Sequence, residues 1–369
     1  MPSCVFSKYI HFNHNKARDV NRYFCTVIPI ITLKKGKEAS LFRKHPWVFS
    51  GAIATNCERL EDGQLVSVHR WNGDFLAIGH FQHGSISIRI ISFNEVPINQ
   101  EFWNVRISTM IELRKKLGLL TETNSIFRIC HGEGDEVPGL VIDYYTGVAV
   151  IQCHSIGMIQ HLAAITTALT LSLGDELKAV YHKSSDTLPK RHAITDGYLY
   201  GEAPTPHYAI EDGITYAIDW INGQKTGFFI DQRDNRTLLG KMSQGKKVLN
   251  AFCYSGGFSL QALKNEARIV YSLDSSNKAI TLVEENVQLN GFKDRHISVV
   301  ADAMEFMKEL PEEFDIIILD PPAFAKHLDK KHKAVQGYKR LNAHALRQIK
   351  PGGILVTFSC SQVVDKSLF

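Results

Sequence analysis

Alternation of apolar and polar residues marks the first part of the chain. Between about Val27 and Glu101, short runs alternate with a period of two, and turn residues such as Asn72-Gly73-Asp74 separate them. This pattern is typical of half-buried strands joined by hairpin turns. Residues 27–101 are therefore predicted to form a small β-barrel or sandwich. Its clearest strands are predicted at residues 64–68, 75–80 and 87–92.

Residues 102–206 mix helical and strand patterns. Apolar positions with helical spacing run from Phe102 to Leu117 and stop at Gly118, a common helix end. A turn-rich loop follows at residues 132–139. These features predict a small α+β domain. Its later elements are predicted as strands at 140–144, 149–154 and 178–182 and a helix at 157–173.

Residues 207–369 alternate strand patterns with helical patterns. Alternation of this kind predicts an α/β domain with a parallel sheet that is covered by helices on both faces. The strands are predicted at residues 247–251, 269–273, 297–301, 314–319 and 353–358.

Composition agrees with a globular protein of several domains. The length of 369 residues suggests two or three domains, and 44% hydrophobic and 22% charged residues are typical of soluble folds. No apolar run is long enough to span a bilayer. Residues 1–26 lack the continuous apolar core of a secretory signal, so we expect a disordered extension there.

Charge and cysteine content narrow the partners and cofactors. The formal net charge of +4 permits a nucleic-acid partner without requiring one. The seven cysteines include no CxxC pair, so no metal site is predicted. Their odd number and wide spacing fit reduced thiols in the cytoplasm.

Three successive strands of the last domain are each followed by an aspartate, namely Asp274, Asp302 and Asp320. The carboxyl ends of parallel strands meet at one sheet edge, where open α/β folds bind ligands. A single aspartate is more often a helix cap, but three in register favour a nucleoside-bearing cofactor. Neither a Walker motif nor GxGxxG is present, which disfavours ATP and a dinucleotide. S-adenosylmethionine carries no phosphate and needs neither motif.

Several motifs resemble those of the ribosomal RNA large subunit methyltransferase I family, which makes 5-methylcytosine in RNA. They are GQKTGFFIDQR at 223–233, VLNAFCYSGGF at 248–258, DPPAFAK at 320–326 and SCSQ at 359–362. HPWVFSG at 45–51 and EGDEVPGL at 133–140 resemble that family's PUA and middle domains. The resemblance covers about residue 30 to the end. It implies a Rossmann-like class I methyltransferase domain at 207–369, preceded by a β-barrel PUA domain and a small α+β domain.

Carried over by motif, the resemblance implies S-adenosylmethionine as cofactor and a role for individual residues. Cys360 would be the nucleophile. Asp274 would hold the cofactor's ribose and Asp302 its adenine. The other cofactor-binding residues would be Lys225, Thr226, Gly227, Phe228, Asp231, Arg233, Asn250, Phe252, Ser255, Gly256 and Asp320.

A cysteine at this place suits methylation of cytosine. C5 of cytosine is a poor nucleophile, and a thiolate that adds to C6 makes C5 nucleophilic enough to accept a methyl group. Cys360 follows the last predicted strand, beside the strand that ends at Asp320. We expect Asp320 to hydrogen-bond the N3/N4 edge of the base, and Ser359 and Ser361 to hydrogen-bond the sulfur.

Basic residues indicate where RNA would be contacted, because Lys and Arg contacts to phosphates supply much of the affinity. Trp47 and Phe49 are expected in the core of the barrel. The resemblance implies large-subunit ribosomal RNA as partner, and whether the chain forms a homodimer stays open. The candidate RNA contacts are Lys34, Lys35, Arg43, Lys326, Lys330 and Lys331.

Two alternatives to cytosine C5 methylation stay open. The DPPAF loop resembles the Asn/Asp-Pro-Pro-Tyr/Phe loops of enzymes that methylate exocyclic amines and need no cysteine. The family's chains continue past SCSQ with a helix and two strands, whereas this chain ends nine residues after Cys360. We therefore expect a sheet that is incomplete at its C-terminus, and the second alternative is an RNA-binding protein with an inactive or truncated catalytic domain.

Overall fold

The computed structural model describes residues 28–325 and 327–369, so the extension expected at residues 1–26 and Lys326 lie outside the described residues. The chain divides into two compact units, one reaching to Val96 and the other running from Pro97 to Phe369. Among the helices of the described residues, none combines the length and the apolar composition needed to span a membrane.

The first unit is built on five strands, β1 (Ile30–Thr32), β2 (Trp47–Phe49), β3 (Leu65–His69), β4 (Phe75–Phe81) and β5 (Ile86–Ser92), with the short helices α1 (Ala39–Phe42) and η2 (Ser50–Ala52). They form one sheet in the order β1-β3-β4-β5-β2. An isolated antiparallel bridge joins Leu33, after β1, to Ile53, after β2. Because β1 and β2 are the two edges, this bridge closes the sheet into the expected barrel.

The buried face of this barrel follows the alternation seen in the sequence. Val66 and Val68 of β3 are buried in the core, as are Ile88 and Ile90 of β5. Trp47 and Phe49 do not follow the expectation of burial. Val48 between them is buried, whereas Trp47 is half-buried and Phe49 is 50% exposed. Neighbours of a buried strand residue point to the opposite face, so the expectation was wrong for both aromatic residues.

The second unit begins with helix α2 (Gln100–Lys116), which packs against α4 (Leu162–Leu173). A sheet follows in the order β10-β9-β8-β7-β6, in which only β8 and β9 run parallel. The predicted α+β elements are present, although the helix expected at 157–173 is divided into α3 and α4. The sequence did not predict β6 and β10. The bounds are β6 (Ile126–His131), η3 (Gly132–Asp135), β7 (Leu140–Tyr145), β8 (Val148–Cys153), α3 (Ile156–Ile159), η4 (Gly174–Glu176), β9 (Ala179–His182), η5 (Lys190–His192) and β10 (Gly197–Tyr200).

An antiparallel hairpin that the sequence did not predict, β11 (His207–Glu211) and β12 (Ile214–Ile218), connects this sheet to the last one. Ser125, just before β6, donates its N–H to the carbonyl of Ile210 (2.7 Å). The Ile210 N–H donates in turn to the Ser125 hydroxyl (3.1 Å). These reciprocal bonds tie the hairpin to the edge of the central sheet.

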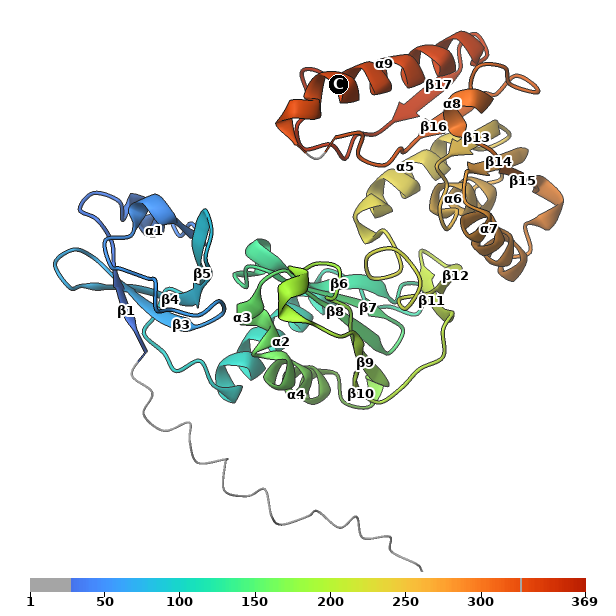
Figure 1. The fold of residues 1–369 in the computed structure, drawn as a ribbon. Coiled ribbons are helices and arrows are strands. Elements are labelled where there is room, and N and C mark those ends of the chain that lie inside the picture. Colours follow the sequence, from blue (N-terminus) through green and yellow to red (C-terminus); the bar gives the residue numbers. More distant parts are fainter. Residues whose placement is uncertain (1–27, 326) are drawn as a thin grey trace, which may run out of the picture. The chain divides into compact units, whose positions relative to one another are not determined.

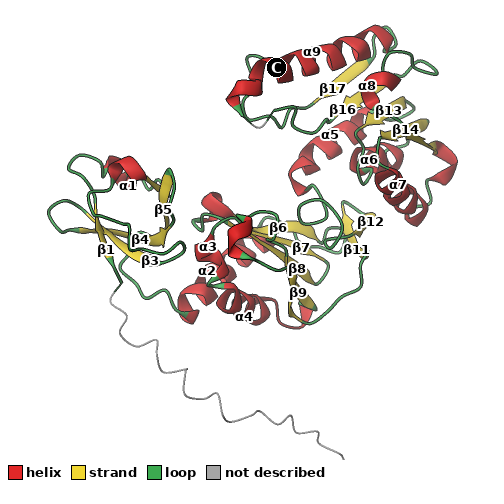
Figure 2. Cartoon of the chain, in the orientation of Figure 1, coloured by secondary structure: helices red, strands yellow, loops and turns green. Residues whose placement is uncertain are grey.

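The last sheet consists of five parallel strands in the order β15-β14-β13-β16-β17. Figure 2 shows the strands flanked by helices, and α9 lies alongside β17 in Figure 1. The predicted strands agree with the observed ones to within two residues at either end. The bounds are η6 (Ile230–Gln232), α5 (Arg233–Met242), β13 (Lys247–Ala251), α6 (Gly257–Lys264), β14 (Ile269–Asp274), α7 (Asn277–Leu289), η7 (Lys293–Arg295), β15 (His296–Val300), α8 (Ala303–Phe306), β16 (Ile316–Leu319), η8 (Leu328–Lys330), α9 (Lys331–Gln348) and β17 (Ile354–Thr357).

Helices cover both faces of this sheet, as the alternation of strands and helices predicts. Val248 of β13 belongs to a core cluster that contains residues of α5, α6 and α7. The next residue, Leu249, belongs to a different cluster with Leu341 and Ala345 of α9. Consecutive strand residues point to opposite faces, so each face has its own apolar core.

Candidate cofactor and catalytic site

A turn of unusual backbone geometry joins β13 to α6 at the edge where the cofactor is expected. Phe252, Tyr254 and Gly256 have positive φ angles of 61°, 47° and 78°. A Cβ at Gly256 would lie 3.1 Å from the side chain of Val283 on α7. Both the backbone angle and the close approach therefore require glycine at this position.

Asp274, at the end of β14, is bound to this turn. Its carboxylate accepts the backbone N–H groups of Tyr254 (3.1 Å) and Ser276 (3.0 Å). A carboxylate has about four acceptor positions, so Asp274 retains capacity for ribose hydroxyls. Asn250, at the end of β13, is buried and donates to the Ser259 hydroxyl (2.9 Å). Among the described residues its Oδ1 has no hydrogen-bond partner, which leaves a buried acceptor below the turn.

Asp302 follows β15 and caps the start of α8. Its carboxylate accepts the backbone N–H of Glu305 at 3.0 Å, and the residue is exposed. The helix-cap role is therefore realised, and a contact to adenine stays a prediction for its remaining acceptor positions.

The GQKTGFFIDQR segment contains both exposed charged side chains and buried side chains. Lys225, with a φ of 49°, and Asp231 are exposed. Thr226 and Phe228 are buried, and the Thr226 hydroxyl is engaged by Asp143 and Tyr145. The exposed pair is thus available to the ends of a bound molecule, whereas Thr226 and Phe228 face the protein interior.

Gly227 and Arg233 of this segment also serve the protein itself. Gly227 has a φ of 108°, and a Cβ there would lie 2.9 Å from the Ile218 side chain. Arg233 donates to the carboxylate of Glu211 (3.1 Å) and to the carbonyl of Ile126. Its supporting role for the cofactor stays a prediction.

Asp320, which follows β16, lies close to several other charges. Burial raises the pKa of its carboxyl group to about 6, and Asp231 contributes in the same direction. Arg236 and Lys225 oppose this rise. The charges of Asp231 and Lys225 thus act on Asp320, although both residues come from the 223–233 segment and neither follows a strand of the parallel sheet.

Cys360 follows β17 and belongs to the same group. Partial burial of the sulfur raises the pKa of its thiol, Asp320 raises it further, and the Lys225 cation opposes this. The sulfur lies 3.7 Å from the Pro321 carbonyl oxygen. Of the five cysteines that the structure describes, Cys360 alone is exposed, and Cys130, Cys153 and Cys253 are buried.

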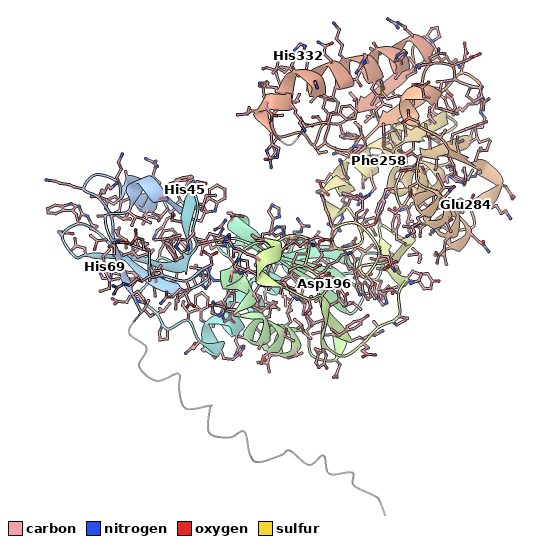
Figure 3. All side chains as sticks on the ribbon, viewed as in Figure 1. His45, His69, Asp196, Phe258, Glu284 and His332 are labelled. Carbon is pink, nitrogen blue, oxygen red and sulfur yellow. The ribbon has the colours of Figure 1, made fainter. Side chains whose placement is uncertain are left out.

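Neighbouring side chains link the Cys360 segment to the cofactor turn. Phe358 stacks on Phe258 of α6, with ring centroids 5.4 Å apart and an interplanar angle of 26° (Phe258 is labelled in Figure 3). The Ser361 hydroxyl bonds to Tyr338 (2.9 Å) and to the Ala325 N–H (3.3 Å). Ser361 thus holds the DPPAF segment and is not hydrogen-bonded to the sulfur, contrary to the expectation.

Of the predicted RNA contacts that the structure describes, Lys34, Lys35, Arg43 and Lys330 are exposed, and Lys331 is half-buried. Lys34 donates to the Gly51 carbonyl (3.2 Å), and the Lys35 ammonium lies 4.9 Å from the ring centroid of Trp71. Arg43 follows α1 and Lys330 precedes α9, both exposed, while Lys331 pairs with Asp365 at 3.5 Å. Lys326 lies outside the described residues.

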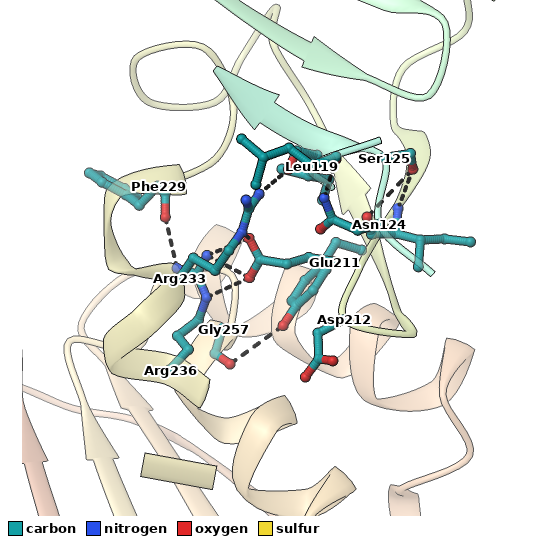
Figure 4. A network of polar contacts seen from close by, with 12 residues as sticks. Leu119, Asn124, Ser125, Glu211, Asp212, Phe229, Arg233, Arg236 and Gly257 are labelled. Atoms are coloured by element: carbon teal, nitrogen blue, oxygen red, sulfur yellow. Dashed lines mark hydrogen bonds and ion pairs between the residues drawn. The ribbon is translucent and has the colours of Figure 1, made fainter. Parts of the chain in front are cut away.

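Sequence reasoning missed a set of buried charges behind the site. Glu211 of β11 accepts from Arg236 (2.6 Å) and Arg233, and Arg236 also donates to the Phe229 carbonyl (2.7 Å), as Figure 4 shows. Asp143 in β7 is a second buried carboxylate, which accepts hydrogen bonds from Arg128 and Thr226. A charged residue inside an apolar strand is a usable signal, because such residues are rarely buried without a partner.

Comparison with known families agrees with this arrangement. Residues 31–93 match a PUA-like domain family, and residues 128–366 match an S-adenosylmethionine-dependent methyltransferase family. Ribosomal RNA large subunit methyltransferase I of Aeromonas hydrophila is 37% identical over 349 residues, covering 92% of this chain and 87% of the relative. The chain belongs to the ribosomal RNA large subunit methyltransferase I family. The family member from Vibrio cholerae serotype O1 is 36% identical over 351 residues, covering 92% of this chain and 88% of its own length.

Solved structures share the fold of this methyltransferase I family chain. A SAM-dependent methyltransferase from Streptococcus mutans superposes with a TM-score of 0.77 at 23% identity, covering 93% of this chain and 88% of that one. A methyltransferase complexed with S-adenosylhomocysteine (SAH) gives a TM-score of 0.78 at 23% identity, with the same coverage. The cofactor is S-adenosylmethionine. The cation, carboxylates and buried amide acceptor around the turn fit its charged and hydrogen-bonding groups.

Proposed function

We propose that this chain methylates C5 of a cytosine in large-subunit ribosomal RNA through a covalent adduct with Cys360. The relatives' names give ribosomal RNA of the large subunit as their substrate. The observation that carries the choice of C5 is the exposed thiol of Cys360 beside Asp320 and Lys225. A C5 methyltransferase needs such a nucleophile.

Four charged residues suit the parts of the cofactor. The Lys225 cation can pair with the methionine carboxylate, and Asp231 with the ammonium group. Asp274 can accept hydrogen bonds from the ribose hydroxyls, and Asp302 from the adenine amino group. When bound, the cofactor supplies an electrophilic methyl group.

Cys360 and Asp320 have different roles toward the base: Cys360 forms the covalent bond and Asp320 supplies a proton. The exposed Cys360 thiol gives its proton to solvent as its sulfur adds to C6, and the electron pair moves to N3, which takes a proton from the Asp320 carboxyl group. A carboxyl group with a pKa of about 6 is suited to hold that proton near neutral pH. C5 of the resulting enamine would take the methyl group that the cofactor supplies, which leaves SAH. Solvent water would then take the C5 proton, N3 would return its proton to Asp320, and the C6–S bond would break to release Cys360 and restore the aromatic ring.

Cys360→Ala tests the covalent route. We expect the variant to lose 5-methylcytosine formation while it still binds SAH, because the thiol is not among the cofactor ligands. Wild type should also form a denaturant-resistant adduct with RNA that contains 5-fluorocytosine, since fluorine replaces the proton that must leave C5. Nucleoside analysis and gel electrophoresis measure the two effects. Cys57→Ala, in the first unit, is the matched control and should behave as wild type.

The outcomes separate the alternatives. Labelled N-methylated nucleosides from Cys360→Ala would favour exocyclic-amine methylation. Wild type that binds RNA but no SAH would favour an RNA-binding protein without catalysis. The ring of Phe324 is half-buried and packs against Tyr338 with ring centroids 4.5 Å apart, so only part of it is available to stack on a base.

A further inference from the structure

A carboxylate in the central sheet is buried without solvent contact. The side chain of Asp143, in β7, is 0% exposed, and both of its oxygens accept from the Arg128 guanidinium (2.7 and 3.0 Å). A third bond comes from the Thr226 hydroxyl at 2.6 Å. Burying a charge costs several kcal/mol unless such partners compensate. The Asp143 carboxylate is held in place by Arg128, and its bond to the Thr226 hydroxyl therefore fixes the position of Thr226.

The hydrogen bonds around Thr226 have a defined direction. Tyr145, also in β7, lies 2.9 Å from the Thr226 hydroxyl. A hydroxyl has one proton, and Thr226 gives its proton to Asp143, so Tyr145 must be the donor to Thr226. Burial raises the pKa of Tyr145 well above its ordinary value, which keeps this donor protonated. Both bonds thus hold a single rotamer of Thr226.

Thr226 lies between residues that serve the cofactor. Lys225 precedes it with a φ of 49°, a conformation that costs energy for a residue with a side chain. The Lys225 cation acts on Asp320 and Cys360. The pKa of Arg128 is raised. Burial lowers it, but the hydrogen-bonded carboxylate of Asp143 raises it, and Tyr145 and Asp231 add smaller contributions in the same direction. The charge of Asp231 therefore acts on Arg128 as well.

Further bonds from the protein fix both ends of the same loop. Lys183 donates to the Gly223 carbonyl at 2.6 Å, and Arg236 to the Phe229 carbonyl at 2.7 Å. The Tyr254 hydroxyl accepts the Gln224 N–H at 3.1 Å. Thr226 is the buried side-chain anchor between these ends, and Asp143 is the charge that holds it.

We propose that Asp143 is a positioning residue for the cofactor, which acts through Thr226 to hold the loop at 224–229, with Tyr145 as the second partner of the Thr226 hydroxyl. The loop then presents Lys225 and Asp231 to the methionine end of S-adenosylmethionine. Asp143 itself touches neither cofactor nor RNA. This inference requires that the chain binds S-adenosylmethionine at the proposed site, and it does not depend on which base is methylated.

Thr226→Val tests the proposal with little change in shape, because a methyl group replaces the hydroxyl. We expect the dissociation constant for SAH to rise about tenfold, the effect of losing one well-placed interaction. We also expect amides 224–229 to exchange hydrogen faster in the cofactor-free protein. Tyr145→Phe should change both quantities in the same direction by a smaller factor. Asp143→Asn is less informative alone, since breaking the buried pair can prevent folding.

Thr187→Val is the matched control. The Thr187 hydroxyl also bonds within the central part, to the Ser184 carbonyl at 2.9 Å, but does not contact the loop. It should leave SAH affinity and exchange at 224–229 at wild-type values. Equal losses in both threonine variants, or SAH affinity of Thr226→Val within twofold of wild type, would overturn the proposal. Intact SAH binding without cytosine methylation would reject only the proposed function.

Discussion

Asp320 shows how one side chain's environment favours one protonation state. Burial and then Asp231 raise the pKa of its carboxyl group from 3.8 to about 6, so folding favours the neutral form. The sequence could predict an aspartate at this place, because it follows a strand of a parallel sheet. Strand patterns could not place Asp231, 89 positions earlier in the chain, beside it, and only the family resemblance assigned both residues to the cofactor site.

The shifted pKa of Asp320 predicts a pH-dependent gain in stability for Asp320→Asn. A group whose folded-state pKa is raised contributes stability that is present below pH 4 and is lost as the pH rises through about 6. The asparagine variant avoids that loss, so its free energy of unfolding should exceed that of wild type by up to about 3 kcal/mol at pH 8 and by little below pH 4. Urea unfolding at both pH values measures the difference. Asp294→Asn, an exposed carboxylate, is the control, and a gain independent of pH would contradict the assignment.

The turn between β13 and α6 shows what an element contributes beyond its residues. The left-handed conformations of Phe252 and Tyr254 cost about 1–2 kcal/mol each. Backbone bonds from Cys253 to Leu273 (3.1 Å) and from Gly256 to Cys253 (2.8 Å) hold the turn. The sequence indicated this turn by its glycines. It did not indicate the strained non-glycine residues, because tertiary bonds impose their geometry.

Gly256→Ala should therefore impair cofactor binding beyond its effect on stability. The added methyl group combines a positive φ with a 3.1 Å approach to Val283, so the turn must shift. Gly245→Ala is a matched control, because Gly245 has a φ of 69° and nothing within 4 Å of an added Cβ. Both variants should lose about 1–2 kcal/mol of stability from backbone strain. Only Gly256→Ala should weaken SAH binding in calorimetry, and equal SAH affinities would refute this explanation.

At the scale of the whole molecule, the chain consists of two compact units with different surfaces. The first unit exposes basic residues and aromatic rings, including Trp71 beside Lys35. The second holds the residues proposed for the cofactor and for catalysis. This division predicts that RNA affinity and cofactor affinity can be changed separately.

Replacing Lys34, Lys35 and Arg43 together with alanine should weaken RNA binding. Each lost phosphate contact lowers the slope of log affinity against log salt by about 0.7–0.9, so the slope should fall by roughly 2–3. SAH affinity should stay at the wild-type value. Filter binding at several salt concentrations provides the measurement. Alanine at Lys246, Lys278 and Lys293, three exposed lysines of the second unit, is the control, and an equal fall there would contradict a specific contact.

The sequence by itself determined the class of each part and the edge at which the site is proposed. Periodicity identified the barrel and the parallel sheet, and strand ends located Asp274, Asp302, Asp320 and Cys360, because parallel strands share one carboxyl edge. Only the tertiary structure decided which side chains hold that edge in place. Asp143 meets Thr226 across 83 positions of the chain. Pairing of buried charges depends on packing between distant segments, which no local pattern of residues encodes.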